Sequence, residues 1–194
     1  MRELKSIEER ILERALYLMG VNKTCDISIR AIAKEANVNV SAINYYFRSK
    51  EEMLGMVKEF YLANTSTVAA ILEQEELDPE EKLILAANEI MEYSLQFPGN
   101  MVILRESLKW AEEDATSRKV VEMSLGVGER LSHLLSMLIP GDKACHAYKY
   151  MMFMSAINYP TEDESSILFK NDMLTQKEER LAYLKLLLKA LKSA

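Results

Sequence analysis

The side chains best suited to binding chemistry lie on a short segment, residues 40–47, whose predicted outward positions carry no charge. Ile43 and Phe47 lie four residues apart and should face inward. The outward positions are Val40, Ser41, Ala42, Asn44 and Tyr45. A solvated surface helix normally carries Lys and Glu, so this uncharged face predicts close approach to another surface. Small side chains would admit the helix into a DNA major groove, where Asn can pair with adenine and Tyr can reach a phosphate.

A cation stands at the start of the next predicted helix. Ser49 and Glu52 have the spacing of a capping box, and Lys50 lies on the first turn that this box begins. An ammonium at a helix start is mildly unfavourable to the helix dipole, but together with the free amides it makes a phosphate clamp. Segment 40–47 and Lys50 together therefore favour contact with both the bases and the backbone of double-stranded DNA.

Two short amphipathic helices joined by a tight turn should hold these residues in place. In the first helix the apolar positions fall at i, i+3, i+4 and i+7, and Ser28 is suited to cap its free amides. These positions are Ile29, Ile32, Ala33 and Ala36. Asn37 tolerates the left-handed conformation of a helix exit, Val38 can fill the corner, and Asn39 can cap the second helix. The pattern is typical of a helix-turn-helix.

The rest of the chain is predicted to be helical. A first helix should begin at a capping box formed by Ser6 and Glu9 and end at Gly20. Later helices are expected at residues 50–74, 79–97, 100–113, 116–138, 142–158 and 175–192, with an extended loop at 159–171. Since no segment alternates like a β-strand, the expected fold is all-α, with three helices in the first 47 residues.

Charge is distributed unevenly along the 194 residues, whose net charge is −6. Residues 1–60 hold ten Lys or Arg against nine Asp or Glu, whereas residues 61–194 hold fourteen against twenty-one. A net charge of +1 in the N-terminal part predicts few phosphate contacts per subunit and a modest salt dependence. No apolar run reaches the roughly 20 residues of a membrane helix, and the N-terminus is not a signal peptide. We therefore expect a cytoplasmic chain that keeps Cys25 and Cys145 reduced.

Residues 7–54 resemble the DNA-binding domain of the TetR family of bacterial transcriptional regulators. The matching residues are Arg30, Ile32 and Ala33, then Ala36 and Val38, then Tyr46 and Phe47, and finally Lys50 with Met53 or Leu54. Three positions depart from the family pattern. Asn37 replaces the usual Gly, Asn39 replaces Ser or Thr, and Asn44 replaces a Tyr that commonly touches a phosphate in the family. The last departure favours contact of Asn44 with a base edge.

The resemblance implies two domains: a helix-turn-helix DNA-binding domain at residues 1–50 and a helical ligand-binding and dimerisation domain at residues 51–194. It also implies a regulator, most commonly a repressor, that a small molecule releases from DNA. The residues expected to contact DNA are Ser28, Arg30, Val40, Ser41, Ala42, Asn44, Tyr45, Tyr46 and Lys50.

Two late helices carry more apolar surface than one core can cover. The segment 142–158 is apolar nearly all round, and the segment 175–192 has Leu residues on more than one side. Both helices could be core, but the excess predicts a homodimer, and in the family these two helices usually form a four-helix interface. A twofold dimer would place two reading helices about 34 Å apart, in successive major grooves of a pseudo-palindrome.

A small-molecule pocket would draw on adaptable and aromatic side chains of the central helices. The candidates for contact with a largely apolar ligand are Met91, Met101, Leu104, Trp110, Met123, Met137, Tyr150 and Met154. Core packing would explain the same residues. Gly126 and Gly128 interrupt a helical pattern, which indicates either a bend or a close approach of a neighbouring helix.

Other functional classes have less support. The sequence has no Gly-rich phosphate loop, no nucleophile elbow and no pair of acid and base residues at a meaningful spacing, so we expect no enzyme and no cofactor. His133 and His146 lack metal-ligand spacing, so no metal site is expected either. The alternative to a DNA-binding regulator is a helical protein-interaction module whose helix-turn-helix docks on a protein partner. The uncharged face of segment 40–47 permits this alternative, and the low basic charge mildly favours it.

Overall fold

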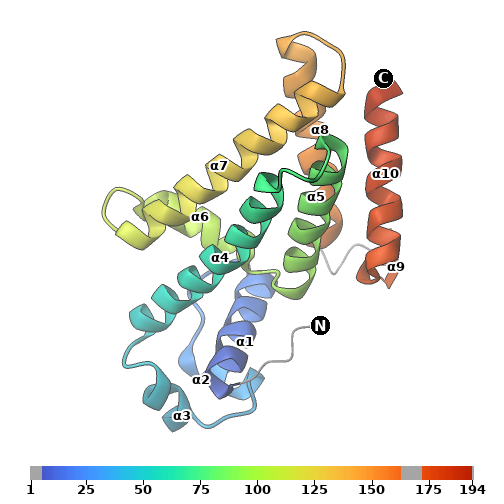
Figure 1. The fold of residues 1–194 in the computed structure, drawn as a ribbon. Helices are drawn as coiled ribbons and strands as arrows, with labels where there is room; N and C mark the ends of the chain where they lie inside the picture. Colours follow the sequence, from blue (N-terminus) through green and yellow to red (C-terminus); the bar gives the residue numbers. More distant parts are fainter. Residues whose placement is uncertain (1–5, 163–171, 194) are drawn as a thin grey trace. The chain divides into compact units, whose positions relative to one another are not determined.

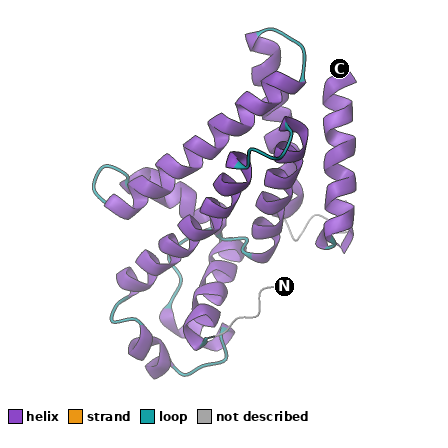
Figure 2. Ribbon diagram, viewed as in Figure 1, coloured by secondary structure: helices purple, strands orange, loops and turns teal. Residues whose placement is uncertain are grey.

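The computed structural model describes residues 6–162 and 172–193, and within these stretches every regular element is a helix (Figures 1 and 2). The helices are α1 (Ile7–Asn22), α2 (Ile29–Glu35), α3 (Val40–Tyr46), α4 (Lys50–Glu73), α5 (Pro79–Gln96), α6 (Asn100–Trp110), α7 (Ala115–Leu138), α8 (Lys143–Glu162), α9 (Asp172–Thr175) and α10 (Lys177–Ser193). The predicted all-α fold is confirmed. In the described part of the chain, no helix combines the length and the apolar character needed to cross a membrane.

The chain divides into two compact units that are not continuous in sequence. Unit 1 comprises Met1–Ala63 and Phe97–Val121, and unit 2 comprises Asn64–Gln96 and Glu122–Ala194. Helices α4 and α7 each contribute one part to unit 1 and the other part to unit 2. These units do not follow a single division after residue 50, because α6 and the start of α7 pack with the N-terminal helices. A functional boundary between residues 1–50 and 51–194 stays a prediction.

In unit 1, the end predicted for α1 at Gly20 is wrong. The helix continues to Asn22, and Lys23 adopts the left-handed conformation with φ 55°. The backbone N–H of Lys23 donates to the Gly20 carbonyl, and that of Thr24 donates to the Met19 carbonyl, which together close the helix. A Lys gives little sequence signal for such an exit, because left-handed residues are usually Gly or Asn.

Gly20 is required by packing instead. A Cβ built at Gly20 would lie 2.5 Å from the carbonyl carbon of Pro98, and one built at Gly99 would lie 2.2 Å from the carbonyl oxygen of Leu16. The last turns of α1 and the turn before α6 therefore meet backbone to backbone. Neither position leaves room for a side chain.

A polar clamp joins α4 to the start of α7 within unit 1. The Lys58 Nζ donates to Asp114 Oδ2 at 2.7 Å and to Ser117 Oγ at 2.9 Å. Asp114 also accepts the backbone N–H of Ser117 and so caps α7, which begins one residue before the predicted Thr116. The hydrogen bonds from Lys58 and Ser117 hold the pKa of Asp114 well below its usual range.

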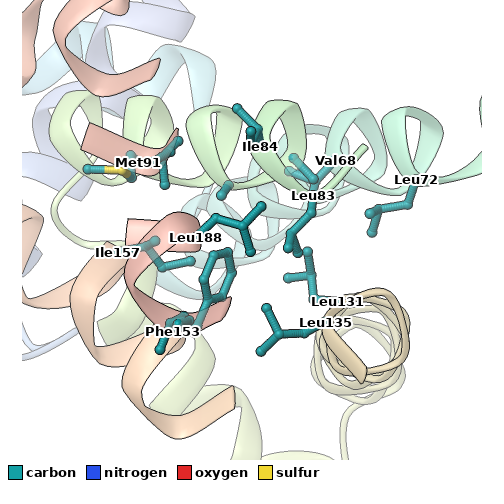
Figure 3. Packing of buried hydrophobic residues seen from close by; sticks show 14 of the residues in the cluster. Val68, Leu72, Leu83, Ile84, Met91, Leu131, Leu135, Phe153, Ile157 and Leu188 are labelled. Carbon is teal, nitrogen blue, oxygen red and sulfur yellow. The ribbon is translucent and has the colours of Figure 1, made fainter. Parts of the chain in front are cut away.

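Unit 2 is built on a large apolar core (Figure 3). Its side chains come from the second part of α4, from α5, α7 and α8, and from α10. They include Val68, Leu72, Leu83, Met91, Leu131, Leu135, Phe153, Ile157 and Leu188. Each of these helices contributes a stripe of buried residues, and the stripes meet in one cluster.

Helix α8 extends further than predicted, to Glu162 rather than Asn158. It continues through Pro160, which has no N–H to donate to the carbonyl of Ala156, four residues earlier. That carbonyl accepts the hydroxyl of Tyr183 on α10 instead, at 2.7 Å. The loop predicted at 159–171 is thus helical for its first four residues, and residues 163–171 lie outside the described part of the chain.

Helix α10 begins at Lys177, two residues after the predicted start at Thr175, which is the last residue of α9. Arg180 is buried at this junction. Its guanidinium donates to Asn88 Oδ1, to Glu92 Oε2 at 2.7 Å, and to the carbonyls of Leu174 and Thr175. One buried cation therefore fixes the α9–α10 turn to α5.

Candidate DNA-contacting surface

The turn between α2 and α3 has the geometry expected from its sequence. Asn37 adopts the left-handed conformation, with φ 51°. The N–H of Asn37 donates to the Lys34 carbonyl at 3.2 Å, and the N–H of Val38 donates to the Ala33 carbonyl at 3.0 Å. This pair of bonds is a Schellman motif, which ends α2 abruptly and fixes the direction in which the chain enters α3.

Helix α3 is fixed by its cap and by its inward side chains. Asn39 Oδ1 accepts the backbone N–H of Ala42 at 2.7 Å and the hydroxyl of Ser41 at 2.6 Å. Ile43 and Phe47 are buried, with 1% and 2% of their surfaces exposed. The helix ends at Tyr46, one residue before the predicted end, and Phe47 becomes its cap. The Asn39 cap fixes the start of α3, and the two buried side chains fix its inner side. The other side of α3 therefore makes no contact with the core.

The predicted contact face of α3 lies on the surface. Val40, Ser41, Asn44 and Tyr45 are exposed, and Ala42 is half-buried. Tyr45 is 83% exposed, and the half-buried Tyr46 ring supports it edge to face, with 5.2 Å between ring centroids. These positions follow one face of the helix, so the structure presents the uncharged side chains together.

Ser28, Arg30 and Lys50 differ in how far they are already engaged. Ser28 is exposed, but its Oγ caps α2 by accepting the N–H of Ala31 at 3.2 Å. Arg30 is exposed on the first turn of α2. Lys50 is partly buried, and its Nζ donates to Asp26 Oδ1 at 2.6 Å. Among the described residues, Lys50 is the one of these three that forms an ion pair with an acidic side chain.

Other groups at the start of α4 also interact with carboxylates. The N–H of Glu52 donates to Ser49 Oγ at 3.1 Å, as the capping box predicts, but Glu52 Oε2 accepts the N–H of Arg48 at 3.2 Å. Hydrogen bonds from its own backbone N–H and from Ser49 lower the pKa of Glu51. Asp26 and Glu52 thus each accept a hydrogen bond at or just before the start of α4.

Sequence reasoning missed two charged residues at this surface. Arg48 is exposed directly after α3, and its place behind the Tyr46–Phe47 pair was a usable signal. Asp26 gave no signal, because it lies 24 residues from Lys50 in the sequence. The pairing brings the loop between α1 and α2 to the first turn of α4.

The candidate ligand residues do not form one group. Met101, Leu104 and Trp110 belong to unit 1, and the other five belong to unit 2. Met91 is fully buried in the unit 2 core, with Tyr150 and Met154 packed against that core. Trp110 and Met137 are exposed. A ligand-binding role for any of these residues stays a prediction.

Cys25 and the two histidines lie in different surroundings. Burial, and secondarily the nearby Glu106, raises the pKa of Cys25 to about 11. The His146 Nε2 lies 2.9 Å from the Ile139 carbonyl, and His133 is exposed. Within the described residues, no three His, Cys, Asp or Glu side chains are grouped in a way that could hold a metal ion.

A capped α2, a Schellman turn and an α3 held by its cap and two buried side chains define a helix-turn-helix. Residues 11–57 match the family described as bacterial regulatory proteins, tetR family. The N-terminal part of this chain is therefore similar to the N-terminal part of that family.

One relative aligns over part of the chain. It is the probable HTH-type transcriptional regulator YttP of Bacillus subtilis (strain 168), which is 38% identical over 64 residues. The aligned segment spans 32% of this chain and 31% of that protein. The likeness is thus limited to about a third of each protein.

Solved structures are similar over nearly the whole chain. The TetR-family regulator PfmR from Thermus thermophilus is 20% identical with a TM-score of 0.61, covering 96% of this chain and 97% of its own. The ketosteroid transcriptional regulator KstR2 of Mycobacterium tuberculosis is 15% identical with a TM-score of 0.72, covering 97% and 96%. AibR in complex with isovaleryl coenzyme A and operator DNA is 12% identical with a TM-score of 0.63, covering 90% and 96%. These likenesses establish a shared all-α fold.

Proposed function

We propose that this chain is a homodimeric transcriptional regulator that binds a pseudo-palindromic DNA site through α3 and represses until a small, largely apolar molecule releases it. The exposed, uncharged face of α3 carries the proposal. A helix with small residues at its start, a free Asn amide face and an exposed Tyr suits the major groove. Arg30, Arg48 and Lys50 flank it with the cations that phosphate contact requires.

The exposed apolar surface of α8 supports dimerisation. Tyr148, Met151 and Met152 are exposed by 63%, 64% and 58%, and on α10 Leu186 is exposed by 67%. Within unit 2 these two helices are joined by the Tyr183–Ala156 hydrogen bond and by Lys149, whose Nζ donates to the Leu191 carbonyl at 2.9 Å. Large apolar side chains gathered on one helix favour an interface, and a second copy of the same surface would cover them.

The effector proposal rests on unit 2. Tyr150 and Met154 are half-buried over the apolar core, and Met91 lies within that core. The Tyr150 hydroxyl lies 3.0 Å from where a Cβ of Gly128 would stand, so the glycine permits a close approach of α8 to α7. AibR, described with isovaleryl coenzyme A, shares the fold, which favours an effector with an apolar part for this chain too.

Titrating the full chain against duplex DNA from its own promoter region tests the DNA contact. Fluorescence anisotropy should show saturable, salt-sensitive binding. Arg30→Ala and Lys50→Ala should weaken binding to every sequence and flatten the salt dependence, because phosphate contacts carry no sequence information. Asn44→Ala should instead relax the preference at one base pair, by about 1 to 3 kcal/mol.

The alternative, a protein-interaction module, predicts a different result in the same titration. No binding by the wild-type chain at any salt concentration would reject the DNA-binding proposal and favour a protein partner for α3. Equal losses on all sequences for Asn44→Ala would reject its assignment to a base edge while leaving DNA binding intact.

Sedimentation velocity tests the dimer separately. Met151→Glu places a charge in the apolar surface of α8 and should convert the dimer to a monomer. Leu108→Glu is the matched control, because Leu108 is 58% exposed but lies on α6 in unit 1. A Met151→Glu chain that sediments as the wild type does would place the interface elsewhere.

A further inference from the structure

Lys50, which is predicted to hold a DNA phosphate at the start of α4, is paired with a carboxylate of its own chain. Asp26 accepts from Lys50 Nζ at 2.6 Å, and Glu52 accepts the N–H of Arg48 at 3.2 Å. A phosphate offers the same kind of anionic oxygen as a carboxylate, so the two groups compete for the same donors.

The Asp26–Lys50 pair has the geometry of a competitor for phosphate. The Lys50 side chain is only 29% exposed, whereas that of Asp26 is 91% exposed. Most of the Lys50 side chain is therefore buried, whereas the Asp26 carboxylate paired with it is open to solvent. A phosphate that binds Lys50 must displace this carboxylate or lie beside its negative charge.

We propose that Asp26 is an affinity-lowering residue that occupies Lys50 in the free protein and is exchanged for a DNA phosphate on binding. The proposal rests on the proposed function, since it takes Lys50 as a phosphate contact. An exposed ion pair contributes little to folding, so keeping Asp26 against this cation has a small structural benefit. Its larger effect is on DNA, because each binding event must break the pair and leave a carboxylate near a phosphate.

The exchange of Asp26 for a phosphate also limits how steeply the affinity for DNA depends on salt concentration. Contact with one phosphate normally releases about 0.9 of a counterion, but an uncovered Asp26 carboxylate would recruit a cation in return. The observed slope should then be shallower than the number of phosphate contacts indicates. This agrees with an N-terminal part in which ten basic residues stand against nine acidic ones.

Asp26→Asn tests the proposal in the full-length protein, with a fluorescein-labelled duplex of scrambled sequence as the probe. A scrambled duplex suffices because phosphate contact does not depend on sequence. We expect binding to tighten about three- to tenfold at low salt, the order expected for removing one charge a few ångströms from a phosphate in water. The slope of log K against log salt should steepen by up to about 0.9.

Two comparisons separate exchange from a general charge effect. Glu35→Gln removes one charge from an exposed residue of the same unit. Glu35 pairs with Arg14 at 3.9 Å, and Arg14 is not among the residues predicted to contact DNA. It should tighten binding less than Asp26→Asn does and leave the slope unchanged. In a chain that already carries Lys50→Met, Asp26→Asn should tighten DNA binding much less than it does in the wild-type chain. Circular dichroism should show the same helix content for all variants.

Several results would overturn the exchange. Weaker or unchanged binding by Asp26→Asn would mean that the carboxylate positions Lys50 or has no effect. An equal gain in the Lys50→Met background, or from Glu35→Gln, would mean that only net charge matters. Failure of the wild-type chain to bind any duplex would reject the proposed function itself, which is a distinguishable result.

Discussion

The two compact units are stabilised in different ways. In unit 1, helix ends are set by local caps, and the packing between α1 and the turn before α6 depends on two glycines that leave no room for a side chain. In unit 2, a continuous apolar cluster draws on five helices, and a buried Arg180 joins α5, α9 and α10. Substitutions that add atoms should therefore destabilise unit 1 most, and substitutions that remove buried groups should destabilise unit 2 most.

The largest expected effect is on unit 1. Gly20→Ala and Gly99→Ala each push a Cβ to within 2.5 Å or less of backbone atoms, which cannot move as a side chain can. Each substitution should lower the free energy of unfolding by about 3 kcal/mol or more, measured by urea denaturation. Loss of this packing should also weaken DNA binding, because α1 supports α2 and α3.

Two other glycines provide controls for that result. A Cβ at Gly55 or at Gly126 would meet nothing within 4 Å, and both residues lie inside helices. Gly55→Ala in unit 1 and Gly126→Ala in unit 2 should each stabilise the chain by about 0.5 to 1 kcal/mol. If Gly20→Ala were as well tolerated as Gly55→Ala, the contrast between the units would fail.

A smaller effect is expected from removing the buried cation of unit 2. Arg180→Met leaves Asn88, Glu92 and the carbonyls of Leu174 and Thr175 without their donor. Because the Glu92 side chain is 33% exposed and can be partly hydrated, the expected loss is about 2 to 3 kcal/mol rather than the full cost of a buried charge.

Arg130→Met is the matched control in the same unit. Arg130 pairs with Glu73 at 2.7 Å, but the two side chains are 47% and 65% exposed. Removing an exposed pair should cost about 0.5 kcal/mol or less. Equal losses for Arg180→Met and Arg130→Met would mean that burial of Arg180 contributes nothing, and the α9–α10 turn would then be held by apolar contacts alone.

The same contrast explains what could be predicted from the sequence. Caps are short-range, so Ser28, Asn39 and Ser49 were predicted correctly, as was the left-handed Asn37. The exposed face of α3 followed from the spacing of its two buried residues. Its DNA contacts stay a prediction, because a residue's exposure does not reveal its partner.

The errors came from long-range interactions. The sequence pattern predicts a helix end at Gly20, but the real constraint on this glycine is Pro98, 78 positions away. Helix α8 was ended before Pro160 because the hydroxyl that satisfies the freed carbonyl belongs to Tyr183 on another helix. Asp26 was overlooked beside Lys50 for the same reason. The spacing of residues in the sequence reveals helical faces and caps. It does not reveal which groups, far away in the sequence, pack against a glycine or satisfy a carbonyl that has lost its helical hydrogen bond.

The last expected effect concerns reactivity rather than stability, and it tests whether unit 1 is well packed around Cys25. With a pKa of about 11, only roughly one Cys25 thiol in a thousand is a thiolate at pH 8, against about one in ten for an ordinary thiol with a pKa of 9.0. In a Cys145→Ser chain, iodoacetamide should therefore react about a hundredfold faster after unfolding in guanidinium. In the folded chain the rate should rise about tenfold per pH unit up to pH 10, because the thiolate is the reacting form. A plateau near pH 8 would mean that the Cys25 thiolate forms easily, that burial does not control it, and that unit 1 is loosely packed at this residue.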